Sequence, residues 1–319
     1  MKLRLVIAAA TQFLASAAFA QSIAPQPTQW IVAPAFAKSN DARENISGAA
    51  CAVTQPAYRA CLAVNDEKKY AQLFSIDGNT IVPGTVVRLL GDNADGDPDA
   101  EGVAYSGGYF YVVGSHGLSR KKGKLQGASF LVFRIPANLK TGGAGEIAPA
   151  VQTSSRLRAA LRADEHIGPF AERPLSANGA NIEGIAVDGG RLYAGLRGPS
   201  VGGRAFILSA NLGGVFGGGN LGATVHLLAL GAGAGIRDLA RVDGGLLVLA
   251  GPATEEGVPA AVFHWNPASG GLKKLSNLGG TSGKAETLLV LGQTEQNYRV
   301  LVMFDGIANG GPTEYLLPR

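Results

Sequence analysis

Charged side chains recur at one position of a repeated pattern in this chain. Each copy has a charged residue beside Gly or Leu, a short apolar run, a Gly-rich or polar turn and a second apolar run. Because charged residues make up only 16% of the chain, their return in apolar surroundings indicates a common site. The copies start at Asp99, Asn181, Gly235 and Lys284, and a weaker fifth starts at Ser47.

The acidic residues of the pattern favour a metal site. A hard cation such as calcium prefers six to eight oxygen ligands, and carboxylates from several copies would supply some of them. We therefore expect a divalent cation, with calcium favoured, held by Glu101, Glu183, Glu286 and Asp305.

The other polar residues near these positions favour hydrolysis beside the cation. A bound cation lowers the pKa of a water molecule, and Arg197 with Arg237 would stabilise the oxyanion that develops. We expect His116 or Asp66 to act as the general base. If the protein is an enzyme, we therefore expect a hydrolase of ester or phosphoester bonds that acts on a small polar or anionic ligand.

The same charges allow a second interpretation. Arg197 and Arg237 can neutralise the glutamates, so that buried ion pairs tie neighbouring repeats together. The protein would then be a non-catalytic binding or interaction module of the cell envelope. Metal analysis, together with thermal unfolding with and without a chelator, distinguishes the two interpretations.

The repeats predict an all-β fold, a β-propeller. Equivalent positions lie about 50 residues apart, with one interval of about 80, which is the scale of a four-stranded blade. We expect five blades, with six as the alternative if the long interval hides another. That interval also predicts a helical insertion near 154–167, because Leu157 and Leu161 lie one turn apart after the possible N-cap Ser155.

This fold would bring the charged residues together. The first two strands of a blade run antiparallel, so the start of the first and the end of the second emerge on one face. The expected mouth of the axis therefore collects the metal ligands, both arginines, His116 and Asp66.

The two cysteines predict a disulfide. Cys51 and Cys61 lie symmetrically about a turn near Pro56, and on adjacent antiparallel strands they would face each other. Two buried thiols are the alternative.

The N-terminal residues predict export. Lys2 and Arg4 precede an apolar stretch and the small-residue pattern that ends at Ala20, which is the layout of a secretory signal peptide over 1–20. A single propeller domain would then occupy 21–319, in the periplasm or secreted. No later segment is long and apolar enough to span a membrane. The net charge of +4 does not favour nucleic acid. We expect a small-molecule ligand, and the sequence does not define a protein partner.

Two further segments predict local structure. The last repeat supplies only three strands, so we expect the segment 29–36 to add the fourth strand and close the ring. The acidic stretch from Gly91 does not match the spacing of a calcium loop, and we interpret it as a solvated turn.

Four phrases in order resemble a known family: GSH from Gly114, NIEGIAV from Asn181, GLRGP from Gly195 and GIRDL from Gly235. They are similar to a bacterial family of exported, propeller-like proteins classed as a domain of unknown function. The resemblance covers most of the chain from about Ser47. That family is distantly similar to esterase-like, phytase-like and calcium-dependent lactonase propellers, which implies a hydrolytic or metal-assisted site on the axis at Glu101, Glu183, Arg197, Arg237 and Glu286.

Overall fold

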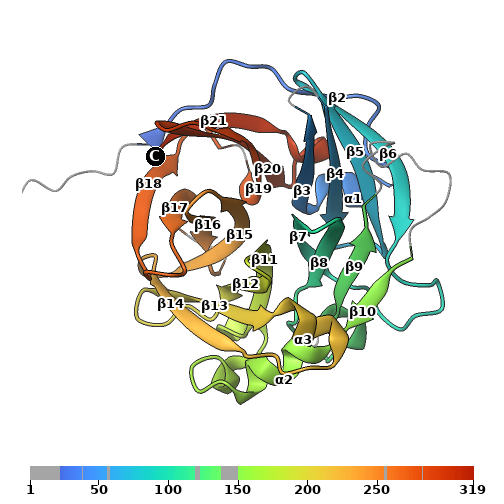
Figure 1. The fold of residues 1–319 in the computed structure, drawn as a ribbon, viewed down its shortest axis with the longest axis vertical. Coiled ribbons are helices and arrows are strands. Elements are labelled where there is room, and N and C mark those ends of the chain that lie inside the picture. Colours follow the sequence, from blue (N-terminus) through green and yellow to red (C-terminus); the bar gives the residue numbers. More distant parts are fainter. Residues whose placement is uncertain are drawn as a thin grey trace, which may run out of the picture.

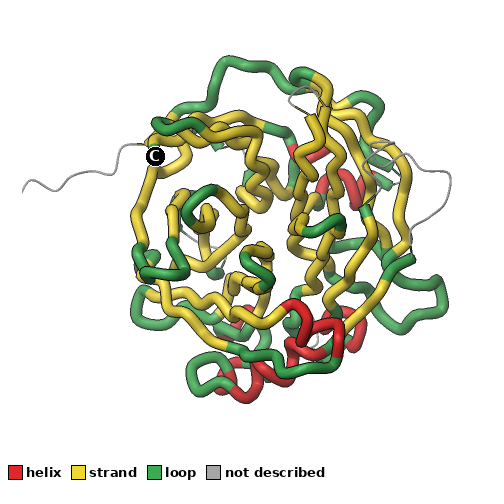
Figure 2. Tube along the Cα trace, in the orientation of Figure 1, coloured by secondary structure: helices red, strands yellow, loops and turns green. Residues whose placement is uncertain are grey.

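The computed structural model describes residues 22–37, 39–55, 58–118, 123–137, 150–254, 257–281 and 283–319. Five sheets stand around a central axis as the blades of a propeller (Figure 1). Strands form the ring, and α2 and α3 lie together at its rim (Figure 2). The predicted fold class, a five-bladed propeller, is confirmed. The predicted signal peptide lies outside the described residues.

Each blade is built from consecutive antiparallel strands, counted outward from the axis. Blade 1 has β3 (Ile46–Gln55), β4 (Tyr58–Asn65), β5 (Tyr70–Asp77) and β6 (Thr80–Arg88), and blade 2 has β7 (Ala100–Ser106), β8 (Tyr109–Gly114), β9 (Val132–Pro136) and β10 (Gln152–Ser154). Blade 3 has β11 (Asn181–Asp188), β12 (Arg191–Gly198), β13 (Arg204–Asn211) and β14 (Thr224–Ala229), and blade 4 has β15 (Ala234–Val242), β16 (Gly245–Pro252), β17 (Ala261–Trp265) and β18 (Leu272–Leu278). Blade 5 has β19 (Lys284–Gln293), β20 (Asn297–Asp305) and β21 (Thr313–Pro318).

Short helices occupy some of the connections. The α-helices are α1 (Asn40–Glu44), α2 (Arg156–Ala163) and α3 (Leu212–Gly217), and the 3-10 turns are η1 (Gly127–Phe130), η2 (Gly168–Phe170), η3 (Leu175–Ala177) and η4 (Ala308–Gly310).

Tight turns that contain glycine connect the inner strand to the next strand in blades 2, 3 and 4. In blade 3, Asp188 pairs with Arg191, and the two residues between them are Gly189 and Gly190, at φ 55° and 76°. Two positive φ values in succession suit the right-handed twist of a hairpin, and glycine adopts them without a steric penalty. The Gly-rich turns of the repeat pattern therefore set the hairpin register.

Glycines also let the inner strands approach one another around the axis. A Cβ atom on Gly102 would stand 2.9 Å from the carbonyl oxygen of Glu183, and one on Gly184 would stand 2.7 Å from the Cα atom of Asp238. Real Cβ atoms essentially never come so close to backbone atoms. The glycine that follows each glutamate in the AEG and NIEG phrases is thus required by backbone contact between neighbouring blades.

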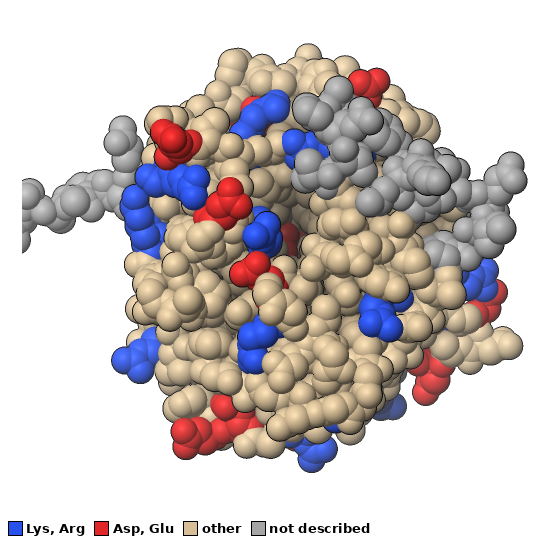
Figure 3. Space-filling model, in the orientation of Figure 1, with Lys and Arg blue, Asp and Glu red and all other residues tan. Residues whose placement is uncertain are grey.

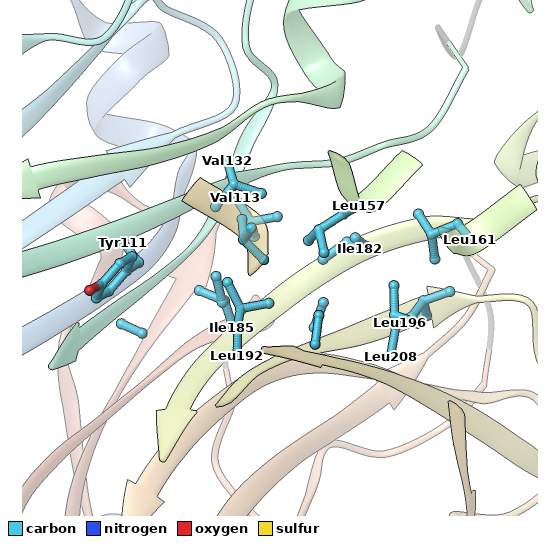
Figure 4. Packing of buried hydrophobic residues seen from close by; sticks show 14 of the residues in the cluster. Tyr111, Val113, Val132, Leu157, Leu161, Ile182, Ile185, Leu192, Leu196 and Leu208 are labelled. Atoms are coloured by element: carbon cyan, nitrogen blue, oxygen red, sulfur yellow. The ribbon is translucent and has the colours of Figure 1, made fainter. Parts of the chain in front are cut away.

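The largest apolar core cluster lies between blades 2 and 3, and the insertion is part of it. Leu157 and Leu161 of α2 are at most 1% exposed and pack with Ile182, Leu196 and other strand residues (Figure 4). The predicted helical insertion is confirmed. It covers the space between two blades rather than forming a sixth.

The N-terminal segment contacts three blades in turn. The prediction that 29–36 supplies the fourth strand of the last blade is wrong. β1 (Ser22–Ile23) pairs in parallel with β18 of blade 4, and β2 (Ile31–Val32) pairs in parallel with β6 of blade 1. Between them the chain runs along blade 5, where the Gln26 amide donates to Glu314 O. Pro25 and Pro27 lack an N–H group, so this stretch cannot form a continuous ladder with β21.

The Cys51–Cys61 disulfide is present, as predicted. The two residues lie directly opposite each other on β3 and β4. Within the described residues, no helix has the length and apolar character needed to cross a membrane.

Candidate functional site

Every inner strand carries a β-bulge near its start. In each blade, one residue of the inner strand is skipped between two successive pairs with the neighbouring strand. A bulge of this kind redirects a side chain and is common beside functional sites. The skipped residues are the equivalent positions of the repeat pattern: Ser47, Glu101, Glu183, Arg237 and Glu286.

Glu183 is the centre of a buried chain of ion pairs. Its Oε1 atom lies 3.0 Å from Arg197 Nη1, and its Oε2 atom lies 3.3 Å from Arg237 Nη2. Arg237 Nη2 also contacts Glu286 Oε1. None of the four side chains is more than 8% exposed. Because they belong to blades 3, 4 and 5, the chain of ion pairs joins these blades at the axis.

Asp238 adds a second link between blades 4 and 5. Its two carboxylate oxygens accept hydrogen bonds from the backbone amides of Leu239 and Leu288, both at 2.7 Å. Burial raises the pKa of Asp238 well above its usual range, although the two hydrogen bonds oppose that shift. The Leu288 amide belongs to β19, so this carboxylate serves contact between blades.

A different group of carboxylates lies between blades 1 and 2. Asp66, Asp99 and Glu101 each offer one oxygen atom, and these atoms lie within 4.8 Å of one another. Asp66 follows β4, Asp99 precedes β7, and Glu101 is the bulge residue of β7. Glu101 is 3% exposed and makes neither a hydrogen bond nor an ion pair within the described residues. We call these three residues the carboxylate triad.

Electrostatics distinguish the triad from the ion pairs. Burial is the main cause that holds the pKa of Glu101 well above its usual range, followed by the negative charges of Glu183, Asp99 and Asp66, while Arg237 opposes the shift. A divalent cation among the three carboxylates would offset both the burial and the repulsion. The donor set consists of oxygens alone, which suits calcium or magnesium better than a transition metal.

Arg237 has hydrogen-bonding capacity left over. Its side chain is 1% exposed, and Nη2 makes both ion pairs, but Nε and Nη1 have no hydrogen-bond partner in the part of the chain that the structure describes. Burial lowers the pKa of Arg237, while the nearby charges of Glu183, Glu101 and Asp305 raise it. Buried, unsatisfied guanidinium donors are costly, so an anionic oxygen bound here would be stabilised strongly.

His116 is buried and oriented, and it is not a member of the triad. Nδ1 lies 2.9 Å from Gly114 O, and because a carbonyl only accepts, the proton is on Nδ1 and Nε2 is the acceptor. Burial lowers the pKa of His116 to about 4. Its backbone has φ 54°, and its carbonyl accepts a hydrogen bond from Arg158 of α2. The ring stands 6.2 Å from that of Phe130 and is not a member of the carboxylate group.

Most of the predicted site residues fall into three places. Glu101 and Asp66 meet in the triad, Glu183 and Glu286 are paired with the two arginines, and His116 lies toward α2. Asp305, at the end of β20 opposite Lys284, acts on Arg237 through its charge.

Asp99 belongs to the triad but was not among the site residues predicted from the sequence. The preceding acidic residues Asp92, Asp95 and Asp97 are exposed, as expected for a solvated turn. Asp99 differs, since it has φ 47° at the entry to β7 and is partly buried in the triad. Its position as the first residue of a repeat copy was the available signal.

At the far ends of the inner strands the axis opens into a cavity of about 450 Å³. Its walls are mostly apolar, and Arg59 and Arg241 are the charged residues among its described lining. The space-filling view shows a hollow at the centre of the ring with acidic and basic side chains beside it (Figure 3).

The chain matches the family described as "Protein of unknown function (DUF3616)" over residues 61–131 and 134–312. It belongs to that family. The match includes Glu101, Glu183, Arg237 and Glu286, and it confirms the resemblance found in the sequence. No curated protein matches the chain.

Several solved structures are distantly similar to this chain, at low identity and with TM-scores below 0.5. An engineered GH43 glycoside hydrolase with endo-xylanase and exo-arabinofuranosidase activity is 12% identical, with a TM-score of 0.47 over 87% of this chain, and this chain spans 50% of it. An exo-1,5-alpha-L-arabinanase from a bovine ruminal metagenomic library is 9% identical, with a TM-score of 0.44 over 88% of this chain and 95% of that one. A putative 6-phosphogluconolactonase from Bacteroides fragilis is 11% identical, with a TM-score of 0.39 over 84% and 82%. These values give distant likeness of fold, and we transfer no activity from them.

Proposed function

We propose that the carboxylate triad binds a divalent cation, with calcium favoured, and that the loaded site holds a small anionic ligand. The observation that carries the proposal is the approach of Asp66, Asp99 and Glu101 within 4.8 Å, with Glu101 buried and making no ion pair of its own. A buried carboxylate among like charges is costly unless a cation compensates it.

Arg237 supports the anionic part of the proposal. Its charge acts on Glu101, so the guanidinium is near the triad, and two of its nitrogens have no partner within the described residues. An anionic group could bind the cation with one oxygen and accept hydrogen bonds from Arg237 with another. A carboxylate, a phosphate or an ester in its oxyanion form has this geometry.

The chemistry we propose is hydrolysis of an ester or phosphoester bond. When bound, the cation would supply a water of lowered pKa and polarise the substrate oxygen. Asp66, which is partly buried, would take the proton as the new bond to the carbonyl carbon or phosphorus forms. Arg237 would stabilise the oxyanion, and Asp66 would return its proton to the leaving oxygen as the bond from that oxygen to carbon or phosphorus breaks.

A non-catalytic role has its own support. Glu183, Arg197, Arg237 and Glu286 are paired across blades, and Asp238 bonds the amide of a neighbouring blade. These contacts favour cohesion of the ring. In this second candidate function the axis is a rigid support for a binding module, and the triad is a structural cation site.

We also propose that the protein is exported to the periplasm or secreted. The disulfide supports an oxidising compartment. Sequencing of the N-terminus of protein recovered from its native cell should begin near Gln21, and a chain that still starts at Met1 would contradict export.

The test is calcium binding to metal-stripped protein by isothermal titration calorimetry. We expect one site per chain, and Glu101→Gln should weaken it at least about tenfold because the variant loses a charged ligand. Glu295→Gln is the matched control, because it removes an exposed carboxylate that is not part of the triad. Absence of calcium and magnesium binding to the wild type, or equal affinity in Glu101→Gln, would remove the basis of the proposal. Hydrolysis of model esters and phosphoesters with and without calcium then separates the catalytic function from the non-catalytic one.

A further inference from the structure

A second cavity, with polar walls, lies between blades 3 and 4, away from the triad. Its volume is about 450 Å³, at the lower end of small-molecule sites. Asp188 and Arg241, which border it, stand at the far ends of their inner strands. The carboxylates of the triad stand at the starts of theirs, so this cleft opens toward the opposite face of the ring.

A buried serine organises one wall of the cleft. Ser209 is fully buried, and its Oγ atom lies 2.8 Å from Arg191 Nη2, 2.9 Å from His226 Nε2 and 3.3 Å from Thr224 O. Arginine only donates and a carbonyl only accepts, so all three contacts are satisfied when the hydroxyl donates to Thr224 O and Nε2 of His226 carries the proton. Nδ1 of His226 is then the ring's acceptor, and it has no hydrogen-bond partner in the described part of the chain.

Aromatic rings hold the histidine in place from both blades. Trp265 of blade 4 stands edge-on to His226 with centroids 5.0 Å apart, and Tyr193 of blade 3 stands 5.9 Å from Trp265. Burial and the charge of Arg191 lower the pKa of His226, so the ring stays neutral in neutral solution. The wall therefore presents a fixed acceptor beside a ring face.

Arg241 supplies positive charge at the opposite side. Its Nε atom donates to Asp188 Oδ1 at 3.1 Å, which orients the guanidinium. Its two terminal nitrogens make no hydrogen bond within the described residues, and the side chain is 57% exposed. A planar, oriented and free pair of N–H donors fits a carboxylate or phosphate.

We propose that this cleft is a second ligand site, for a monosaccharide-sized polyol that carries a carboxylate or a phosphate group. The anionic group binds the terminal nitrogens of Arg241, a hydroxyl donates to Nδ1 of His226, and the carbon skeleton lies against Tyr193. The site is independent of the axial cation site. The cleft has Arg191 and Arg241 against one carboxylate, Asp188, so its described charged lining favours an anion over a neutral sugar.

The test uses glucuronate, glucose 6-phosphate and glucose as probes, with EDTA present so that a cation at the triad cannot contribute. The sequence has two tryptophans, and in a Trp30→Phe background Trp265 reports the binding through its fluorescence. We expect at least one anion to bind at least about tenfold more tightly than glucose, because charge-assisted hydrogen bonds are the stronger ones. Comparison of the two anions shows whether the site takes a carboxylate or a phosphate.

Two variants test whether the anion binds in this cleft. Arg241→Gln should lower the affinity for the anion at least about tenfold. Arg204→Gln, which removes an exposed arginine from the other end of blade 3, should leave that affinity unchanged. The proposal would be overturned by binding that survives Arg241→Gln or by binding that is lost in Glu101→Gln. It would also be overturned if no probe gave a response up to about 10 mM, a concentration above the dissociation constants typical of specific sites.

Discussion

The β-bulge near the start of each inner strand has opposite electrostatic surroundings on the two sides of the axis. On the side of blades 3, 4 and 5, Glu183 and Glu286 point to arginines and are neutralised. On the side of blades 1 and 2, Glu101 points to Asp66 and Asp99, and the carboxylates accumulate. The bulge thus brings a buried charge to the axis, and the side chains that meet it there decide whether that charge is neutralised in an ion pair or lies among like charges.

The largest expected effect comes from breaking the ion-paired side. Glu183→Gln leaves Arg197 without its carboxylate and Arg237 with one fewer, and it should lower the free energy of unfolding by about 3 to 5 kcal/mol. Glu101→Gln removes a repelled, buried charge and should leave stability unchanged or raise it. Urea unfolding of both variants without calcium measures the contrast. The double variant Glu183→Gln with Arg197→Met should recover part of the loss, and equal losses for Glu183→Gln and Glu101→Gln would mean that the two sides do not differ.

A second effect concerns His116, which lies outside both groups. Its folded pKa is about 4, below the ordinary value of 6.5, so the unfolded chain takes up a proton that the folded one does not. Stability is therefore fully present above pH 6.5 and is lost as pH falls toward 4, by up to about 3 kcal/mol. His116→Asn, which tolerates the positive φ, should flatten this part of the stability profile, and the exposed His166→Asn should not. An unchanged slope in His116→Asn would assign the acid sensitivity to other groups.

A third effect concerns calcium at the carboxylate triad. Because burial raises the folded pKa of Glu101, its contribution to stability is greatest at low pH and is lost as pH rises through that raised pKa. Calcium needs the ionised carboxylates, so the stabilisation it gives should grow with pH. At a calcium concentration of about 100 times Kd the gain is about 2.7 kcal/mol. Thermal unfolding with and without calcium at several pH values measures it, and a gain that falls as pH rises would contradict the proposed ligands.

The smallest effect tests the backbone contact on which both sides depend. Gly184→Ala places a methyl group 2.7 Å from Asp238 Cα and should cost about 1 to 3 kcal/mol as strands β11 and β15 separate. Gly292→Ala is the matched control, since a Cβ atom there meets nothing within 4 Å. Chemical denaturation should show a loss in the first variant alone. Equal stability of the two would mean that the inner strands are looser than their contacts indicate.

Much of the fold could be predicted because it is local. The alternation of apolar runs and glycine turns sets the inner hairpins of blades 2, 3 and 4, and the return of Glu101, Glu183 and Glu286 at equivalent positions shows which strand starts face the axis. The helix with Leu157 and Leu161 and the facing cysteines follow from local spacing in the same way. The N-terminal strand was misplaced because its choice among free sheet edges depends on distant blades, and Pro25 and Pro27 favour two short pairings over one long one.

The repeat spacing and the strand direction are enough to predict that charged residues reach the axis in most blades. Which of those charges neutralise one another depends on how the blades pack, and the repeat pattern does not contain that information. A carboxylate and a guanidinium pair when the bulges of two blades, about 50 residues apart, bring their atoms within a few ångströms, and that distance depends on how closely the glycines let the inner strands approach. Asp99 entered the triad for the same reason, because its position follows from the packing of blade 2 against the end of β4 in blade 1.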